Sequence, residues 1–210
     1  MKPVSYTIKL PQWVDGILRG SENIYRTIDE RMELALDFAA NNISNNGSPF
    51  GAAVFERDSG RLIAPGINLV LQTNCSVVHA EIVAIMLAQQ QVANFDLGAA
   101  GLPAYELVST TEPCAMCLGA IPWSGISSLV CGARDEDARS IGFDEGDKPV
   151  DWVRNLESRA ISVTRDIHRE KAKAVLQQYV DAGGIIYNGR TRQFHNRFFA
   201  QGGEENDGRY

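Results

Sequence analysis

Apolar residues recur along this chain with two different spacings. From a cap at Thr27 or Asp29 to about Ile43 they have helical spacing, as in a helix with one buried face. At 50–55 and 62–70 they form short runs separated by Arg-Asp-Ser-Gly, a sequence typical of a turn between strands. The pattern predicts a helix followed by a β-hairpin.

Further along, apolar runs of strand length alternate with longer helical runs. Strands are expected at 105–109, 128–131 and 161–163, and helices at about 79–87, 114–123 and 167–182. Such alternation is typical of an α/β fold. We therefore expect a three-layer α/β/α sandwich around a mixed sheet of about five strands.

The chain has 210 residues, enough for one domain with peripheral extensions. We expect an irregular N-terminal extension at 1–25, one domain at 26–190, and a C-terminal tail at 191–210 whose polar, glycine-rich end is disordered. No apolar run reaches the length of a membrane span, and the first ten residues lack the apolar core of a secretory signal. These features predict a cytoplasmic protein without membrane association.

The formal net charge of the chain is −6. Proteins that bind nucleic acids usually present a basic face. Here the basic patch of note consists of Arg190, Arg192 and Arg197. The charge balance favours a small-molecule substrate and argues against a nucleic-acid partner.

Two short motifs carry the candidate chemistry, His79-Ala80-Glu81 and Pro113-Cys114-Ala115-Met116-Cys117. One imidazole and two thiolates supply three zinc ligands, which leave tetrahedral zinc a fourth position for water, as in catalytic sites. The two cysteines share one face of a helix, and a helix N-terminus favours thiolates. The glutamate two residues after the histidine is well placed to carry protons.

Two other interpretations of these motifs are open. A C-x-x-C pair alone also occurs in redox sites and in structural zinc sites, for which His168 or His195 would supply the fourth ligand. Neither alternative gives Glu81 a role. The remaining cysteines, Cys75 and Cys131, are expected to be buried and free.

The combination of H-x-E with P-C-x-x-C resembles the signature of zinc-dependent deaminases of the cytidine/deoxycytidylate deaminase superfamily. The likeness extends to segments 48–52, 68–70, 114–121 and 141–146. Across roughly residues 26–190 the chain is similar to bacterial guanine deaminases and to plant guanosine deaminase. The resemblance implies a cytidine deaminase-like fold and a zinc catalytic domain that hydrolyses guanine to xanthine and ammonia, with amino-triazines such as ammeline as further substrates.

The same resemblance assigns the catalytic machinery. It implies that His79, Cys114 and Cys117 hold one Zn²⁺ per subunit, with a catalytic water as the fourth ligand. Glu81 would shuttle protons between water, ring nitrogen and leaving amine, and Glu145 would be a second acidic residue that accepts from guanine N–H groups. An ordinary solvated charge in an acidic loop is the alternative for Glu145.

The resemblance also assigns substrate contacts. Asn68 would hydrogen-bond the ring, Phe50 and Phe143 would pack against the base, and Ala80 is assigned to substrate binding. The alternatives are a strand end for Asn68 and core packing for the two aromatic residues.

Other functions and assembly states stay open at this point. Guanosine, cytosine and cytidine are alternative substrates, editing of adenosine in tRNA is a less favoured function, and a zinc-stabilised binding protein is the non-enzymatic alternative. The resemblance implies a homodimer and a C-terminal segment, with aromatic residues from Tyr187 onward, that covers an active site of its own or of the partner subunit. Packing is the alternative role of that segment.

Overall fold

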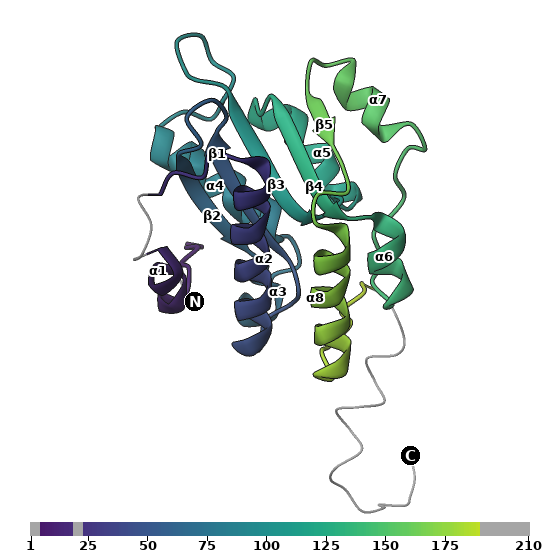
Figure 1. Cartoon of the computed structure of the whole chain (residues 1–210). Coiled ribbons are helices and arrows are strands. Elements are labelled where there is room, and N and C mark those ends of the chain that lie inside the picture. Colours follow the sequence, from purple (N-terminus) through teal and green to yellow (C-terminus); the bar gives the residue numbers. More distant parts are fainter. Residues whose placement is uncertain (1–4, 19–22, 190–210) are drawn as a thin grey trace, which may run out of the picture.

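A computed structural model describes residues 5–18 and 23–189 of the chain. At its centre is a five-stranded sheet in the order β2-β1-β3-β4-β5 (Figure 1). The strands are β1 (Gly51–Glu56), β2 (Leu62–Ile67), β3 (Tyr105–Thr111), β4 (Ser128–Ala133) and β5 (Ser162–Thr164). Strand β1 runs antiparallel to β2 and β3, whereas β3, β4 and β5 are parallel. The predicted mixed sheet is confirmed.

Helices cover both faces of this sheet, which confirms the three-layer sandwich. Helices α2 and α8 pack on one face, and α4 and α5 on the other (Figure 1). The helices are α1 (Gln12–Leu18), α2 (Ile28–Ser44), α3 (Val70–Thr73), α4 (Ala80–Val92), α5 (Ala115–Ser124), α6 (Asp135–Ser140), α7 (Trp152–Glu157) and α8 (Arg169–Asp181). Among the described residues, no helix combines the length and apolar character that crossing a membrane requires.

Three local expectations were wrong. The segment 1–25 is not irregular throughout, because α1 forms in it and buries Val14 in the core beside α2. The second strand ends at Ile67, and the apolar residues that follow begin the short helix α3. Helices α6 and α7 were not predicted, since six residues are too few to establish a helical period. The tail at 191–210 lies outside the described residues.

Helix α2 begins where the sequence indicates. The hydroxyl of Thr27 accepts from the Glu30 N–H at 3.2 Å, and the Glu30 carboxylate accepts from the Thr27 N–H at 2.9 Å. This reciprocal pair satisfies two N–H groups that a helix start leaves without partners. The cap fixes the point at which the chain turns onto the sheet.

Close approach of α4 to β2 depends on Gly66. A Cβ atom at this position would lie 2.3 Å from the carbonyl oxygen of Ala80, in the first turn of α4. Only glycine therefore lets the start of α4 lie against the strand. This contact places His79 and Glu81 at the edge of the sheet.

The central strand β3 is buried on both faces. Leu107 packs in the cluster formed with α4 and α5, and Val108 packs in the cluster formed with α2 and α8. Successive side chains of a strand point to opposite faces. Ser109 and Thr111 therefore share the face of Leu107, the one that carries the site.

Candidate active site

Three residues form a cluster at the starts of two helices. His79 is the N-cap of α4, Cys114 is the N-cap of α5, and Cys117 lies one turn into α5. Their ligand atoms lie within 4.8 Å of one another. Both helices therefore direct their N-terminal ends, which favour negative charge, at one point. We call these three residues the zinc-ligand cluster.

The distances within the zinc-ligand cluster fit one tetrahedral ion. Nδ1 of His79 lies 3.4 Å from Sγ of Cys114 and 3.6 Å from Sγ of Cys117. Bonds of about 2.1 Å to nitrogen and 2.3 Å to sulfur at a tetrahedral angle separate the two atoms by about 3.6 Å. The donor set of one imidazole and two thiols also suits zinc. His168, by contrast, is not part of the cluster, and its Nε2 lies 3.1 Å from Oδ1 of Asp29 on α2.

The two thiols differ in acidity. A hydrogen bond with Cys117 lowers the pKa of Cys114 to about 4, and His79 acts in the same direction. The same hydrogen bond, together with burial, raises the pKa of Cys117. Cys114 is therefore the thiolate of the pair before metal binding, and metal binding removes the second proton. Of the other cysteines, Cys131 is buried as expected, whereas Cys75 is only half-buried.

Glu81 lies beside the cluster and is almost fully buried, with 7% of its surface exposed. One carboxylate oxygen accepts from the Ser109 hydroxyl at 3.3 Å, and the other lies 3.4 Å from Sγ of Cys117. Burial raises the pKa of this carboxyl. A carboxyl with a raised pKa can accept and return protons near neutral pH.

A cavity of about 180 Å³ opens over Glu81 and the cluster. It is lined by residues from six separate stretches of the chain: Phe50, Asn68, Ser76, His79, Glu81, Thr111, Glu112, Cys114, Phe143, Asp144, Glu145, Tyr187, Asn188 and Gly189. The structure thus brings together the predicted ligand, acid and substrate residues. Ala80 is fully buried against β2 and does not line the cavity, so its assignment to substrate binding stays a prediction.

Two aromatic rings form one wall of the cavity. Phe50 and Phe143 meet edge to face, with ring centroids 4.9 Å apart. Tyr187 also packs edge to face against Phe143, with ring centroids 5.3 Å apart. Phe143 is 6% exposed, so it belongs both to the core and to the cavity wall, and the two interpretations from the sequence do not exclude each other.

The amide of Asn68 is held in one orientation. Its Oδ1 accepts from the Val70 N–H at 3.1 Å and from the Ser48 hydroxyl at 3.3 Å. Behind it, the buried side chain of Asn42 donates to the carbonyl oxygens of Ser48 and Asn68. The Nδ2 group is therefore the part of the Asn68 amide that can donate to a bound molecule.

Glu145 reaches the cavity from the loop after α6. It is 7% exposed, and its carbonyl oxygen accepts from the Ala115 N–H at 2.9 Å. Burial and the nearby Cys114 thiolate raise the pKa of this carboxyl to about 8. Gly146 follows with φ +71°, and a Cβ there would lie 2.9 Å from the Cβ of Ala115. The structure does not support the solvated-charge interpretation of Glu145.

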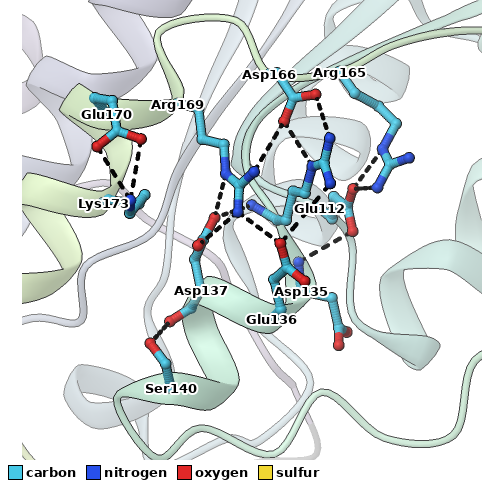
Figure 2. Close-up of polar contacts among 11 residues, drawn as sticks. Glu112, Asp135, Glu136, Asp137, Ser140, Arg165, Asp166, Arg169, Glu170 and Lys173 are labelled. Atoms are coloured by element: carbon cyan, nitrogen blue, oxygen red, sulfur yellow. Dashed lines mark hydrogen bonds and ion pairs between the residues drawn. The ribbon is translucent and has the colours of Figure 1, made fainter.

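The turn between β3 and α5 is fixed by charge. Glu112 is 3% exposed, and its carboxylate accepts from Arg165 at 2.6 Å and from the Asp135 N–H at 3.1 Å (Figure 2). The side chain of Glu112 therefore anchors the turn that precedes the ligand Cys114. These contacts position the turn between β3 and α5.

Sequence reasoning overlooked Ser109, Thr111 and Asn188. Asn188 accepts from the Asp144 N–H at 2.9 Å and donates to the Gly142 carbonyl at 2.8 Å, so it fastens the Glu145 loop. Single serines and asparagines carry no motif that could have identified them. The alternation of β3 could have placed Ser109 and Thr111 on one face, but not in the cavity.

Comparison with known proteins identifies the family. Residues 26–133 match the model of the cytidine and deoxycytidylate deaminase zinc-binding region. The chain belongs to this family. A curated guanine deaminase from Bacillus subtilis is 38% identical over 111 residues, 50% of this chain and 67% of the relative. A tRNA-specific adenosine deaminase from Buchnera aphidicola is 31% identical over 153 residues, 70% and 90% of the two chains.

Similar solved structures align with a larger share of this deaminase-family chain than the two curated relatives do. A structure described as guanine deaminase from Nitrosomonas europaea is 45% identical, with a TM-score of 0.81 over 85% of this chain and 98% of the other. A structure in complex with 2,6-diaminopurine is 46% identical, with a TM-score of 0.80 over 88% and 97%. The family and fold agree with zinc as the metal of the cluster.

Proposed function

We propose that this chain hydrolyses guanine to xanthine and ammonia in the cavity above Glu81. The observation that carries the proposal is that two buried carboxyls, Glu81 and Glu145, meet the zinc-ligand cluster beside an aromatic wall. Likeness to the Nitrosomonas europaea guanine deaminase along 85% of the chain supports guanine as the substrate. The cavity is smaller than the usual 300–1,000 Å³ of sites for drug-sized ligands, which favours a free base.

Each catalytic group has a part in the proposed reaction. A zinc ion in the cluster supplies a Lewis acid that makes water a nucleophile near neutral pH. Glu81 takes the two protons of the attacking water one after the other, and passes one to the ring nitrogen and the other to the amino group, which leaves as ammonia. It can do so because it is buried beside the cluster and held by Ser109. The raised pKa of Glu81 suits both directions of transfer.

The substrate contacts follow from the walls of the cavity. Asn68 donates through Nδ2 to the ring, and Glu145 accepts from guanine N–H groups and assists the leaving amine. Phe50 and Phe143, which contact each other edge to face, pack against the base. Aromatic faces of this kind stack on bases without regard to their polar groups, so selection of guanine falls to the polar residues.

Ammonia release from the zinc-loaded protein tests the substrate. The panel consists of guanine, guanosine, ammeline, adenine, cytosine and cytidine, with Glu81→Gln as the variant that keeps zinc but loses turnover. Guanine well ahead supports the proposal, and guanosine ahead favours a pocket open to ribose. Full activity in Glu81→Gln would remove Glu81 from the mechanism, and Glu145→Gln with wild-type turnover would remove Glu145.

Editing of tRNA adenosine is the second candidate, because the Buchnera aphidicola relative carries that name. The net charge of −6 argues against it. A tRNA-binding assay across salt concentrations decides, since phosphate contacts give a steep dependence on salt. Binding that weakens steeply with salt would favour editing.

We also propose that the protein is a cytoplasmic homodimer. Phe95 and Trp123 are 84% and 86% exposed on the side of α4 and α5, an arrangement that a homodimer would cover. Two thiolate ligands suit a reducing compartment such as the cytoplasm. Light scattering of the purified protein tests the dimer, and a mass of one chain would reject it.

A further inference from the structure

Trp152 lies against two cations from different parts of the chain. It is the first residue of α7, and it is almost fully buried. Nζ of Lys148 lies 5.8 Å from the centroid of the Trp152 ring, and the guanidinium carbon of Arg165 lies 5.7 Å from it. A cation within about 6 Å of an aromatic face is attracted to the negative charge of that face. The ring therefore holds together the loop before α7 and the loop between β5 and α8.

Both cations bind the turn that precedes the ligand Cys114. Lys148 donates to the Pro113 carbonyl at 2.9 Å. Arg165 donates to the buried carboxylate of Glu112 at 2.6 Å (Figure 2). These two partners are the residues directly before Cys114, the N-cap of α5. One aromatic ring is thus connected, through two cations, to two consecutive residues beside a metal ligand.

Trp152 reaches the site through these cations. Among the described residues, it is not one of those that line the catalytic cavity, and it packs in the hydrophobic cluster that also contains Leu156 and Ile161. An apolar ring beside two charges limits the access of water, and ion pairs are stronger where water is excluded. Removal of the ring should therefore weaken both contacts with the turn at the same time.

We propose that Trp152 is a positioning residue for the zinc-ligand cluster. By holding Lys148 and Arg165 against the turn, it keeps Cys114 where its thiol completes the cluster. Groups that orient a metal ligand from outside the site strengthen metal binding. The consequence in this chain is slower release of zinc, and that property does not depend on which base is the substrate.

Trp152→Leu and Trp152→Phe form a matched pair. Both replace the indole by a smaller apolar side chain and should lower the melting temperature, but only phenylalanine keeps an aromatic face. We expect Trp152→Leu to release zinc about three- to tenfold faster than wild type, and Trp152→Phe to stay within about twofold of wild type. Transfer of zinc from the loaded protein to a coloured chelator measures the rate. Each protein should carry one zinc per chain at the start.

Leu156→Ala separates positioning from stability. Leu156 lies one turn further along α7, is also buried, and packs in the same hydrophobic cluster as Trp152. Its truncation should lower the melting temperature and leave zinc release within about twofold of wild type. If Leu156→Ala releases zinc as fast as Trp152→Leu at an equal loss of melting temperature, the ring acts through stability alone and the proposal is overturned. Equal release rates in Trp152→Leu and Trp152→Phe would overturn it as well.

Trp152→Met gives the same comparison if the leucine variant does not fold, because methionine fills irregular space without an aromatic face. A wild-type protein that retains no zinc would also overturn the proposal. Zinc transfer is measured without substrate, so failure to release ammonia from guanine leaves these rates unaffected. A failure of Trp152 as a positioning residue and a failure of guanine as the substrate are therefore distinguishable.

Discussion

Lys148 forms an ion pair with Asp135, with 2.5 Å between Nζ and Oδ1, and its side chain is only 7% exposed. The same Nζ donates to the Pro113 carbonyl at 2.9 Å, next to the ligand Cys114. Lys148 therefore joins the Glu145 loop to the turn that begins α5. It does so without lining the cavity itself.

The first prediction concerns this link. Lys148→Met leaves the Pro113 carbonyl without its donor and loosens the loop, so we expect a loss of about 1–3 kcal/mol in the free energy of unfolding. Because Glu145 is then less well placed, KM for guanine should rise while bound zinc stays at one per chain. Denaturant titration and steady-state kinetics measure the two effects.

A surface pair provides the control for Lys148. Lys171→Met removes an exposed contact with Glu33 and should change stability by less than about 1 kcal/mol. Kinetic constants should not change in this variant. A wild-type KM in Lys148→Met would show that the link does not position Glu145.

The second prediction concerns Ser109, which donates to Glu81 at 3.3 Å. Ser109→Ala removes the hydrogen bond to the carboxyl that we propose carries protons, so we expect kcat to fall about tenfold with little change in KM. Zinc content should stay the same. Ser109 is thus predicted to be a positioning residue.

Ser128 supplies a matched control on the next strand. Its hydroxyl donates to the buried carboxylate of Glu106 at 2.9 Å, away from the site. Ser128→Ala should lower stability and leave kcat unchanged. If Ser109→Ala shows the same behaviour as Ser128→Ala, the hydrogen bond to Glu81 has only a structural role.

The zinc-ligand cluster could be predicted from sequence because its ligands lie in two short motifs, each at a helix start. His79 caps α4 and Cys114 caps α5, so local spacing alone brought imidazole and thiols to the right ends of helices. Their meeting in space depends on the order of the strands in the sheet, which the sequence analysis did not predict. The strands and long helices followed from apolar periodicity for the same local reason.

Residues that reach the site through tertiary contacts could not be predicted in this way. Asn188 lies 44 positions from Asp144 in sequence, and the residues that flank Asn188 form no motif that predicts this contact. Thr111 lines the cavity, which only the packed structure defines. Helix α7 is stabilised by packing of Trp152 against β5 and its neighbours, and the sequence of this segment alone did not predict a helix.

The third prediction concerns the metal. Cys117→Ser replaces a thiolate ligand by a hydroxyl, which binds zinc poorly, so bound zinc should fall well below one per chain and guanine turnover should fall with it. Elemental analysis by mass spectrometry measures the metal. Cys75→Ser, at a half-buried cysteine outside the cluster, should retain full zinc content. One zinc per chain in Cys117→Ser would exclude Cys117 as a ligand.

The fourth prediction concerns acid stability. Arg169 on α8 donates to Asp137 and Glu136 on α6 at 2.7–2.9 Å (Figure 2). The hydrogen bonds from Arg169 lower the pKa of Asp137 below its ordinary value. A group whose folded pKa is lowered contributes stability that is present above its unfolded pKa, about 3.9, and is lost as pH falls through the folded pKa.

Arg169→Met tests the sign of this effect. The difference in unfolding free energy between wild type and variant should be constant from pH 7 to about pH 5 and should shrink below about pH 4, as Asp137 becomes protonated in both. Zinc release at low pH affects the two proteins alike and cancels in the difference. Lys173→Met, which removes an exposed pair with Glu170 on the same helix, should show almost no difference at any pH. If the difference in unfolding free energy between wild type and Arg169→Met is as large at pH 3 as at pH 7, the charge on Asp137 does not account for it. Arg169 would then stabilise the protein through packing of its side chain.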